Sequence, residues 1–171
     1  MRGNPQALAE THSTKCELAA EVLASAGSLR LGVRGWSMLP VVWPGDTLVI
    51  DKANGQSVSE GDIVLYQRDR RFFIHRVLGK TVENSMILTQ GDALSQPDPP
   101  VMNSDVLGKV VFILRDGKLI QPHKALTFSS RALAALVQRS EVAARVLVGV
   151  HGMLTMPQSP NSNDRAVPCQ S

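Results

Sequence analysis

The stretch IVLYQRDRRFFIHRVLG, residues 63–79, decides the fold class of this chain. It contains two apolar segments, 63–67 and 71–79, that are separated only by Arg-Asp-Arg at 68–70. Short apolar segments bounded by polar residues are typical of strands, and a gap of this length suits a tight hairpin. The stretch therefore predicts two antiparallel strands that are neighbours in a sheet.

Period-two alternation predicts a further strand in LRLGVRG at 29–35, where Leu and Val alternate with Arg and Gly. Other short apolar segments bounded by turn formers predict strands at 47–52, at 85–90, and in two parts around an Asp-Gly turn within 106–120. By contrast, GDALSQPDPPV at 91–101 is rich in proline. We expect a loop there, because proline cannot donate a ladder hydrogen bond in a central strand.

About seven short strands between residues 28 and 120 predict a mainly-β fold with a small barrel-like or sandwich core. CELAAEVLASA at 16–26 predicts a short helix before this core, and the Ala-, Leu- and Val-rich residues 129–154 predict one or two helices after it. The expected divisions are an N-terminal helix or extension at 1–27, a β domain at 28–120, a helical appendage at 121–156 and a disordered tail at 157–171.

The composition is that of a globular protein. The chain has 171 residues, 43% of them hydrophobic, and a formal net charge of +3. These values indicate one domain with a real core and no nucleic-acid-binding surface. Its two cysteines, Cys16 and Cys169, lie in opposite terminal regions without metal-binding spacing. We therefore expect free thiols, no metal and no cofactor.

The distribution of apolar residues indicates where in the cell the protein is expected. The first 27 residues lack the long apolar region of a secretory signal, since Glu10, Lys15 and Glu17 interrupt them. A later apolar segment, 142–156, is shorter than a membrane span and contains Arg145. We expect an amphipathic or core helix there. The protein is expected to be cytoplasmic, or bound peripherally to a membrane through its C-terminal helices.

Four polar side chains form the inventory of a Ser-His-Asp hydrolase. Ser37 stands alone among apolar residues in RGWSMLP (34–40), and His75 lies in an apolar predicted strand. Asp92 and Asp98 follow in the proline-rich loop. In such enzymes Ser attacks a carbonyl carbon, His accepts its proton, and Asp orients the His. Each residue also has a structural alternative, as a capping Ser, a half-buried His or a turn Asp, and spacing alone does not choose between them.

These residues lie in four short motifs that resemble those of type I signal peptidases and of the self-cleaving SOS-repressor peptidases. The motifs are Ser-Met-x-Pro at 37–40 followed by Gly-Asp at 45–46, Gly-Asp-Ile-Val at 61–64, His-Arg-Val at 75–77, and Gly-Asp at 91–92 followed by Gly-Lys-Val at 108–110. The resemblance covers about residues 28–120. It implies a β domain of the signal-peptidase type that hydrolyses peptide bonds with an active-site serine.

The third motif selects a branch of this superfamily. Bacterial signal peptidases and SOS repressors have a lysine base at this position, whereas archaeal and endoplasmic-reticulum signal peptidases have a histidine, as this chain does at His75. In that branch the functional carboxylate lies six residues after the Gly-Asp aspartate, which leads from Asp92 to Asp98. The resemblance thus implies Ser37 as nucleophile, His75 as general base and Asp98 as the acid that orients it. Asp92 is implied as a supporting or alternative carboxylate.

The residues around Ser37 are expected to bind substrate. The backbone N–H of Ser37 is expected to stabilise the oxyanion that forms during acyl transfer. Many bacterial members add a serine hydroxyl two residues before the nucleophile, but this chain has Gly35 there. We therefore predict substrate contacts at Gly35, Trp36 and Met38, with one side-chain donor fewer than in those relatives.

Three functional hypotheses fit the sequence. The first is a serine endopeptidase that cleaves a peptide or protein precursor, such as a leader or signal peptide; the resemblance implies small residues at the cleavage site. The second is a self-processing regulator of the SOS-repressor type. Against it, only 27 residues precede the first predicted strand, too few for a helix-turn-helix domain. The third is a non-catalytic β-module that binds peptides.

Overall fold

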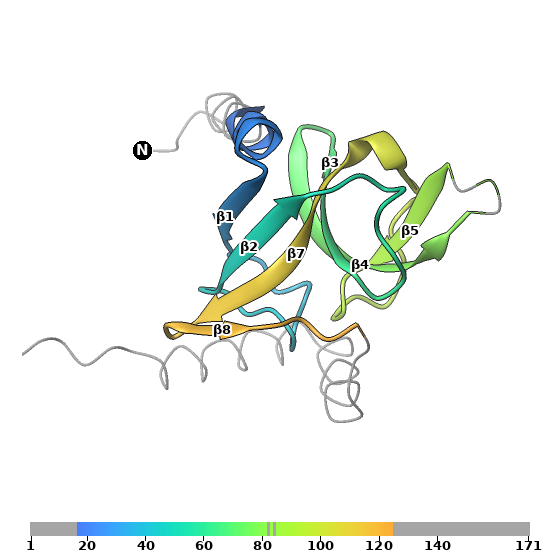
Figure 1. Cartoon of the computed structure of the whole chain (residues 1–171). Coiled ribbons are helices and arrows are strands. Elements are labelled where there is room, and N and C mark those ends of the chain that lie inside the picture. The colour runs from blue at the N-terminus through green and yellow to red at the C-terminus, as the bar shows by residue number, and fades with distance from the viewer. Residues whose placement is uncertain (1–16, 82, 84, 125–171) are drawn as a thin grey trace, which may run out of the picture.

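The computed structural model describes residues 17–81, 83 and 85–124 (Figure 1). The helices predicted after the sheet and the tail predicted at 157–171 lie outside the described residues. The helix predicted before the sheet is confirmed at residues 17–26. It ends at Gly27, whose positive φ of 76° and N–H bond to the Leu23 carbonyl are typical of a glycine that closes a helix.

Eight strands lie within the described residues, and seven of them are at nearly the positions that the apolar segments predict. They are β1 (Ser28–Gly32), β2 (Thr47–Lys52), β3 (Ile63–Arg68), β4 (Arg71–Lys80), β5 (Met86–Gln90), β6 (Val101–Met102), β7 (Val106–Arg115) and β8 (Lys118–Ile120). A single 3-10 turn, Asn103–Asp105, joins β6 to β7.

The strands form one antiparallel sheet in the order β1-β2-β7-β3-β4-β5-β6. β8 pairs with the end of β7, beyond the residues of β7 that pair with β3. The sheet curves strongly (Figure 1), but in the described part of the chain its end strands β1 and β6 do not pair with each other. The mainly-β prediction is therefore confirmed, and its barrel-like form is an open, curved sheet rather than a closed barrel.

The predicted hairpin at residues 63–79 is present as β3 and β4. Asp69 and Arg70 form its two-residue turn, with positive φ values of 51° and 58°. Turns with two positive φ angles match the twist of antiparallel strands, which explains why so short a connection joins them. The Asp116-Gly117 turn between β7 and β8 repeats this geometry.

Two strand boundaries differ from the prediction. β1 ends at Gly32 rather than at residue 35, although Val33 still exchanges backbone hydrogen bonds with the 45–46 turn. The second difference is β6, which the sequence did not predict because it follows the prolines of the 91–101 loop. It has only two residues and pairs only with β5, so the expectation of no central strand in that loop holds.

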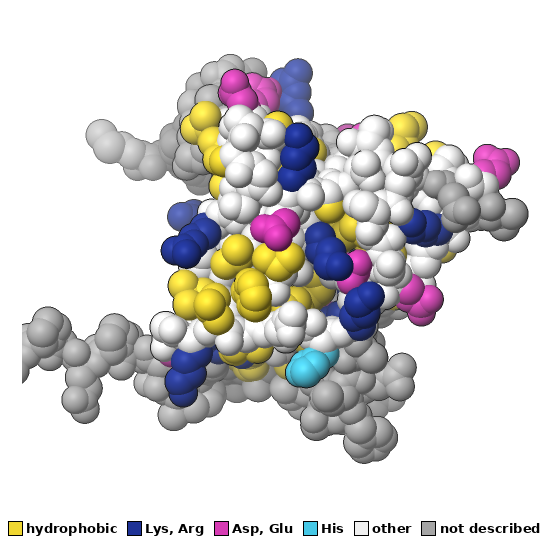
Figure 2. Space-filling model, viewed as in Figure 1, with side chains coloured by type: hydrophobic (Ala, Val, Ile, Leu, Met, Phe, Trp, Pro, Cys, Tyr) yellow, Lys and Arg dark blue, Asp and Glu magenta, His cyan; other side chains and the backbone are white. Residues whose placement is uncertain are grey.

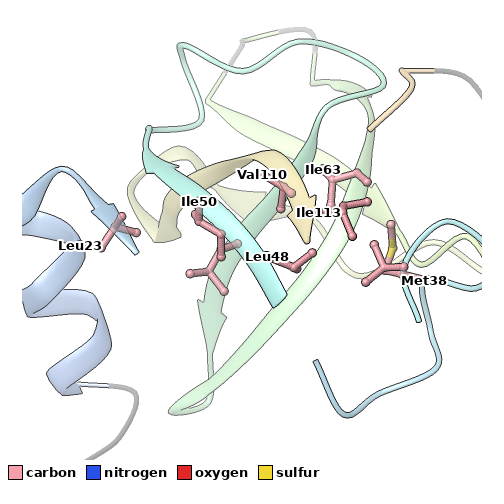
Figure 3. Close-up of a cluster of buried hydrophobic side chains, with 9 residues drawn as sticks. Leu23, Met38, Leu48, Ile50, Ile63, Val110 and Ile113 are labelled. Carbon is pink, nitrogen blue, oxygen red and sulfur yellow. The ribbon is translucent and has the colours of Figure 1, made fainter. Parts of the chain in front are cut away.

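Strand β3 is buried on both faces and separates two apolar clusters. Ile63 and Leu65 pack into one cluster, which Figure 3 shows between the helix and the turn after β1. Val64 and Tyr66 pack into the other cluster, on the opposite face. A fully buried side chain of this kind contributes roughly 1.5–3 kcal/mol to folding, so β3 is a rigid support for its neighbour β4.

Apolar side chains also reach the surface. Figure 2 shows a group of them over β2 and β7, bordered by Lys and Arg side chains. Phe112 of β7 is 38% exposed, and Leu119 of β8 is 63% exposed. In the described ranges, no helix has the length and apolar character that a membrane span requires.

Candidate active site

Ser37 begins a tight turn that follows β1. The Leu39 N–H bonds to the Trp36 carbonyl, and the Met38 carbonyl accepts hydrogen bonds from Val41 and Val42. Met38 and Leu39 are buried, with 3% and 0% exposure, so they fix the turn to the core. The Ser37 side chain lies at the edge of this anchored turn and is partly exposed.

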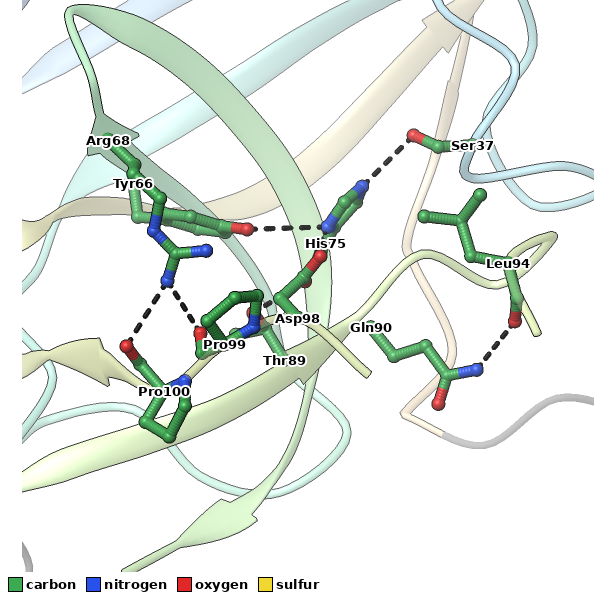
Figure 4. Close-up of polar contacts among 10 residues, drawn as sticks. All are labelled: Ser37, Tyr66, Arg68, His75, Thr89, Gln90, Leu94, Asp98, Pro99 and Pro100. Carbon is green, nitrogen blue, oxygen red and sulfur yellow. Dashed lines mark hydrogen bonds and ion pairs between the residues drawn. The ribbon is translucent and has the colours of Figure 1, made fainter. Parts of the chain in front are cut away.

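His75 lies in the middle of β4, opposite Val64 of β3. Its side chain is buried and points between Ser37 and Asp98 (Figure 4). Nε2 of His75 is 3.1 Å from Oγ of Ser37, and Nδ1 is 2.7 Å from Oδ2 of Asp98. The structure thus brings together three side chains that are far apart in the sequence.

Asp98 is held in the proline-rich loop by β5. Its backbone N–H donates to the Thr89 carbonyl at 2.8 Å, and its Oδ2 accepts the Thr89 hydroxyl at 2.8 Å. Burial alone would raise the pKa of Asp98, but the hydrogen bonds from His75 and Thr89 outweigh burial and lower it. Asp98 is therefore ionised at neutral pH.

The ionised carboxylate determines the His75 tautomer. Because a carboxylate only accepts hydrogen bonds, the proton of neutral His75 is on Nδ1. The lone pair of Nε2 then faces Ser37, whose hydroxyl donates to it. This is the arrangement that a general base needs before it accepts a serine proton.

Asp92 belongs to a different interaction. Both of its carboxylate oxygens pair with the Arg76 guanidinium, at 2.8 and 2.7 Å, and both side chains are buried. Arg76 also donates to the carbonyl oxygens of Gly61 and His123. Arg76 and Asp92 therefore fasten three loops to β4, and the role of Asp92 as a supporting or alternative carboxylate stays a prediction.

The Asp92 loop also contacts the turn that begins at Ser37. The Ala93 N–H donates to the Ser37 carbonyl at 2.9 Å. A Cβ atom at Gly91 would lie only 2.6 Å from the same carbonyl oxygen, so the loop approaches this closely because residue 91 is glycine. On the other side of the turn, Asp46 pairs with Arg115 through both carboxylate oxygens.

The residues predicted to contact substrate lie in different environments. Gly35 and Trp36 are exposed next to Ser37, and Trp36 is 38% exposed. Met38, in contrast, packs into the same apolar cluster as Leu48 and is buried (Figure 3). The Met38 side chain therefore supports the turn from inside, and the prediction that it contacts substrate does not fit its position.

Sequence reasoning missed three residues around Asp98: Tyr66, Arg68 and Thr89 (Figure 4). Tyr66 is fully buried, its hydroxyl lies 3.4 Å from Nδ1 of His75, and burial raises its pKa to about 12. In the sequence, Tyr66 and Thr89 look like ordinary residues of predicted strands. Strand register could have found Thr89, because it stands opposite Val77, two residues from His75.

The geometry defines a class of site: Ser37, His75 and Asp98 have the mutual arrangement of a Ser-His-Asp triad on a mainly-β scaffold. The family model described as Peptidase S24-like matches residues 2–111. The chain belongs to this family, which is one of serine peptidases and includes the SOS-repressor and signal peptidase I types. The resemblance drawn from the motifs is confirmed at this level, and its histidine branch stays a prediction. A comparison with curated proteins finds no match.

Proposed function

We propose that the protein is a serine endopeptidase of the signal-peptidase type, in its histidine branch, and that it cleaves a precursor or leader peptide. The observation that carries this proposal is the continuous chain of hydrogen bonds from Ser37 through His75 to Asp98. The family membership supports the peptidase class. The proposed roles are Ser37 as nucleophile, His75 as general base and Asp98 as its orienting acid.

In the proposed acylation step, Oγ of Ser37 attacks the carbonyl carbon of the substrate and its proton moves to Nε2 of His75. The Asp98 carboxylate stabilises the imidazolium that forms. His75 then donates the proton to the leaving amine as the C–N bond breaks, which leaves an acyl ester on Ser37. Water attacks this ester with His75 again as base, releases the acid product and restores Ser37.

The proposed oxyanion donor is the backbone N–H of Ser37. Within residues 17–81, 83 and 85–124, no protein group accepts a hydrogen bond from this N–H. It therefore can donate to the oxygen of a tetrahedral intermediate. Gly35 has no side-chain donor, so backbone groups supply this stabilisation in the proposed mechanism.

Substrate is proposed to bind beside β1. This strand is at the end of the sheet order, and no described strand pairs with its outer edge. Such an edge presents unpaired backbone groups to which an extended peptide can add. The chain continues from β1 through the exposed Gly35 and Trp36 to Ser37, so a peptide aligned with this segment passes the nucleophile. By resemblance to signal peptidases, small residues would precede the cleaved bond.

The test is hydrolysis of a panel of extended peptides with Ala, Gly or a larger residue before the cleavage position, followed by mass spectrometry. The proposal predicts cleavage after small residues by the wild-type chain and none by Ser37→Ala. Ser104→Ala is a matched control, because it removes the hydroxyl of an exposed serine outside the proposed triad. The Ser104→Ala variant should cleave the peptides normally. Equal turnover by Ser37→Ala would refute the proposal.

The other two hypotheses give different results in the same experiment. A self-processing regulator would shorten its own chain during incubation and ignore the peptides. A non-catalytic module would bind peptides without cleaving them. The 3.1 Å separation of Ser37 Oγ and His75 Nε2 favours the catalytic hypothesis over the non-catalytic one.

A further inference from the structure

We propose that Thr89 and Arg68 are positioning residues that aim the Asp98 carboxylate at the imidazole of His75. This inference rests on the proposed function, because it gives these two residues a role in the same triad. Neither residue lies in one of the four motifs, and among the described residues neither is hydrogen-bonded to Ser37. Their contacts with the Asp98 loop carry the argument.

Thr89 holds Asp98 at two points. Its carbonyl accepts the Asp98 N–H, and its hydroxyl donates to Oδ2, both at 2.8 Å. The second contact is to the same oxygen that His75 approaches at 2.7 Å. Thr89 is fully buried, and a buried hydroxyl requires a hydrogen-bond partner. Thr89 thus fixes both the backbone of Asp98 and the rotation of its carboxylate.

Arg68 holds the chain directly after Asp98. Its guanidinium donates to the carbonyl oxygens of Pro99 and Pro100 (Figure 4). Because proline has no N–H, these carbonyls are the backbone groups through which this segment can be hydrogen-bonded. The guanidinium also lies 5.7 Å from the ring centre of Tyr66, which is within cation–π range.

The two residues restrain Asp98 at adjacent points of the chain. Thr89 is on β5 and binds Asp98 itself, whereas Arg68 ends β3 and binds the two residues that follow. Asp92 and Ala93 hold the start of this loop, whereas Thr89 and Arg68 hold the part with prolines at 97, 99 and 100 that carries Asp98. A misplacement of about 1 Å is enough to cost on the order of 100-fold in rate.

The first test measures the His75 to Asp98 bond without requiring turnover. In the full chain, the proton on Nδ1 of His75 should give a downfield NMR resonance, assigned by its loss in His75→Gln. We expect Thr89→Val to move or broaden this resonance and Thr89→Ser to restore it. Arg68→Met should also move or broaden this resonance, and Arg68→Lys should do so to a smaller extent. An unchanged resonance in Thr89→Val or in Arg68→Met would overturn the role of that residue.

The second test uses a double-mutant cycle with Asp98→Asn. On a cleaved peptide, Thr89→Val and Arg68→Met should each lower kcat by roughly 10-fold and leave KM within twofold. In the Asp98→Asn background, either substitution should have little further effect, because each acts through Asp98. Full additivity would overturn the inference. A wild-type chain that cleaves no peptide would refute the proposed function instead, and the NMR result would still decide the positioning role.

Discussion

Nδ1 of His75 lies 2.7 Å from Oδ2 of Asp98, although 23 residues separate them in the sequence. Asp92, only 16 residues from Arg76, instead binds that arginine through both oxygens. The two carboxylates of the proline-rich loop therefore face different partners. One can orient the proposed base, and the other joins the loop to the sheet.

The first prediction is that substitution of Asp98 and substitution of Asp92 have different effects. Asp98→Asn should lower kcat by up to about 10⁴-fold, because an amide at this position favours the wrong His75 tautomer. Asp92→Asn should instead lower the free energy of unfolding by about 3 kcal/mol or more, because it leaves the buried Arg76 charge without its partner. The measurements are peptide turnover and urea unfolding on both variants.

The two variants act as controls for each other. Asp98→Asn should keep most of its stability, and the Asp92→Asn molecules that fold should keep their kcat. An Asp92→Asn variant that is stable but inactive would instead place Asp92 in the chemistry.

The second prediction concerns the side-chain donor that Gly35 lacks. An added Cβ atom at Gly35 meets nothing within 4 Å, so a serine fits there. Gly35→Ser should raise kcat by roughly 10-fold or more, because its hydroxyl can add a second donor for the oxyanion. Gly35→Ala adds the carbon without the donor and should not raise kcat. Equal rates for the Ser and Ala variants would show that no oxyanion forms near this position.

The third prediction concerns the contact between the Gly91 loop and the turn that begins at Ser37. In Gly91→Ala, the new methyl group would meet the Ser37 carbonyl at 2.6 Å, so the loop or the turn must shift. Turnover should fall by about 10- to 100-fold, because Ser37 moves relative to His75. Gly79→Ala in β4 is the matched control, since its Cβ atom has open space. A Gly91→Ala variant with wild-type kcat would show that this contact does not position Ser37.

The fourth prediction concerns acid unfolding. The folded-state pKa of Asp98 is lowered, so its stabilising contribution is complete above its unfolded pKa of about 3.9. That contribution is lost as the pH falls through the folded pKa. The stability difference between wild type and Asp98→Asn should therefore shrink as the pH falls below about 4. Urea unfolding at several pH values measures it, and a difference that grows as the pH falls below about 4 would contradict the lowered pKa.

The strands could be predicted because their signals are local. Short apolar segments and the turn residues between them identified the hairpin at 63–79 and the Asp116-Gly117 turn, and both are present. The sheet order could not be predicted, because β7 enters between β2 and β3 from a distant part of the chain. β6 was also missed, since two residues are too few to give a periodic signal.

The candidate site, like the fold, could be predicted only in part from the sequence. Ser37, His75 and Asp98 follow from motifs that resemble a known superfamily, and the structure brings them together. Thr89 and Arg68 carry no such signal, because their proximity to Asp98 depends on strand pairing and on the path of the proline-rich loop. Met38 was predicted to contact substrate, but the turn after Ser37 directs its side chain into the core.

The central claim is that Ser37 is a nucleophile activated by His75. The most direct measurement is labelling of the full chain with a fluorophosphonate probe, followed by peptide mapping to locate the modified residue. We predict a single adduct on Ser37, no adduct in Ser37→Ala, and labelling at least about 100-fold slower in His75→Gln. Labelling on another residue, or an undiminished labelling rate in His75→Gln, would contradict the account.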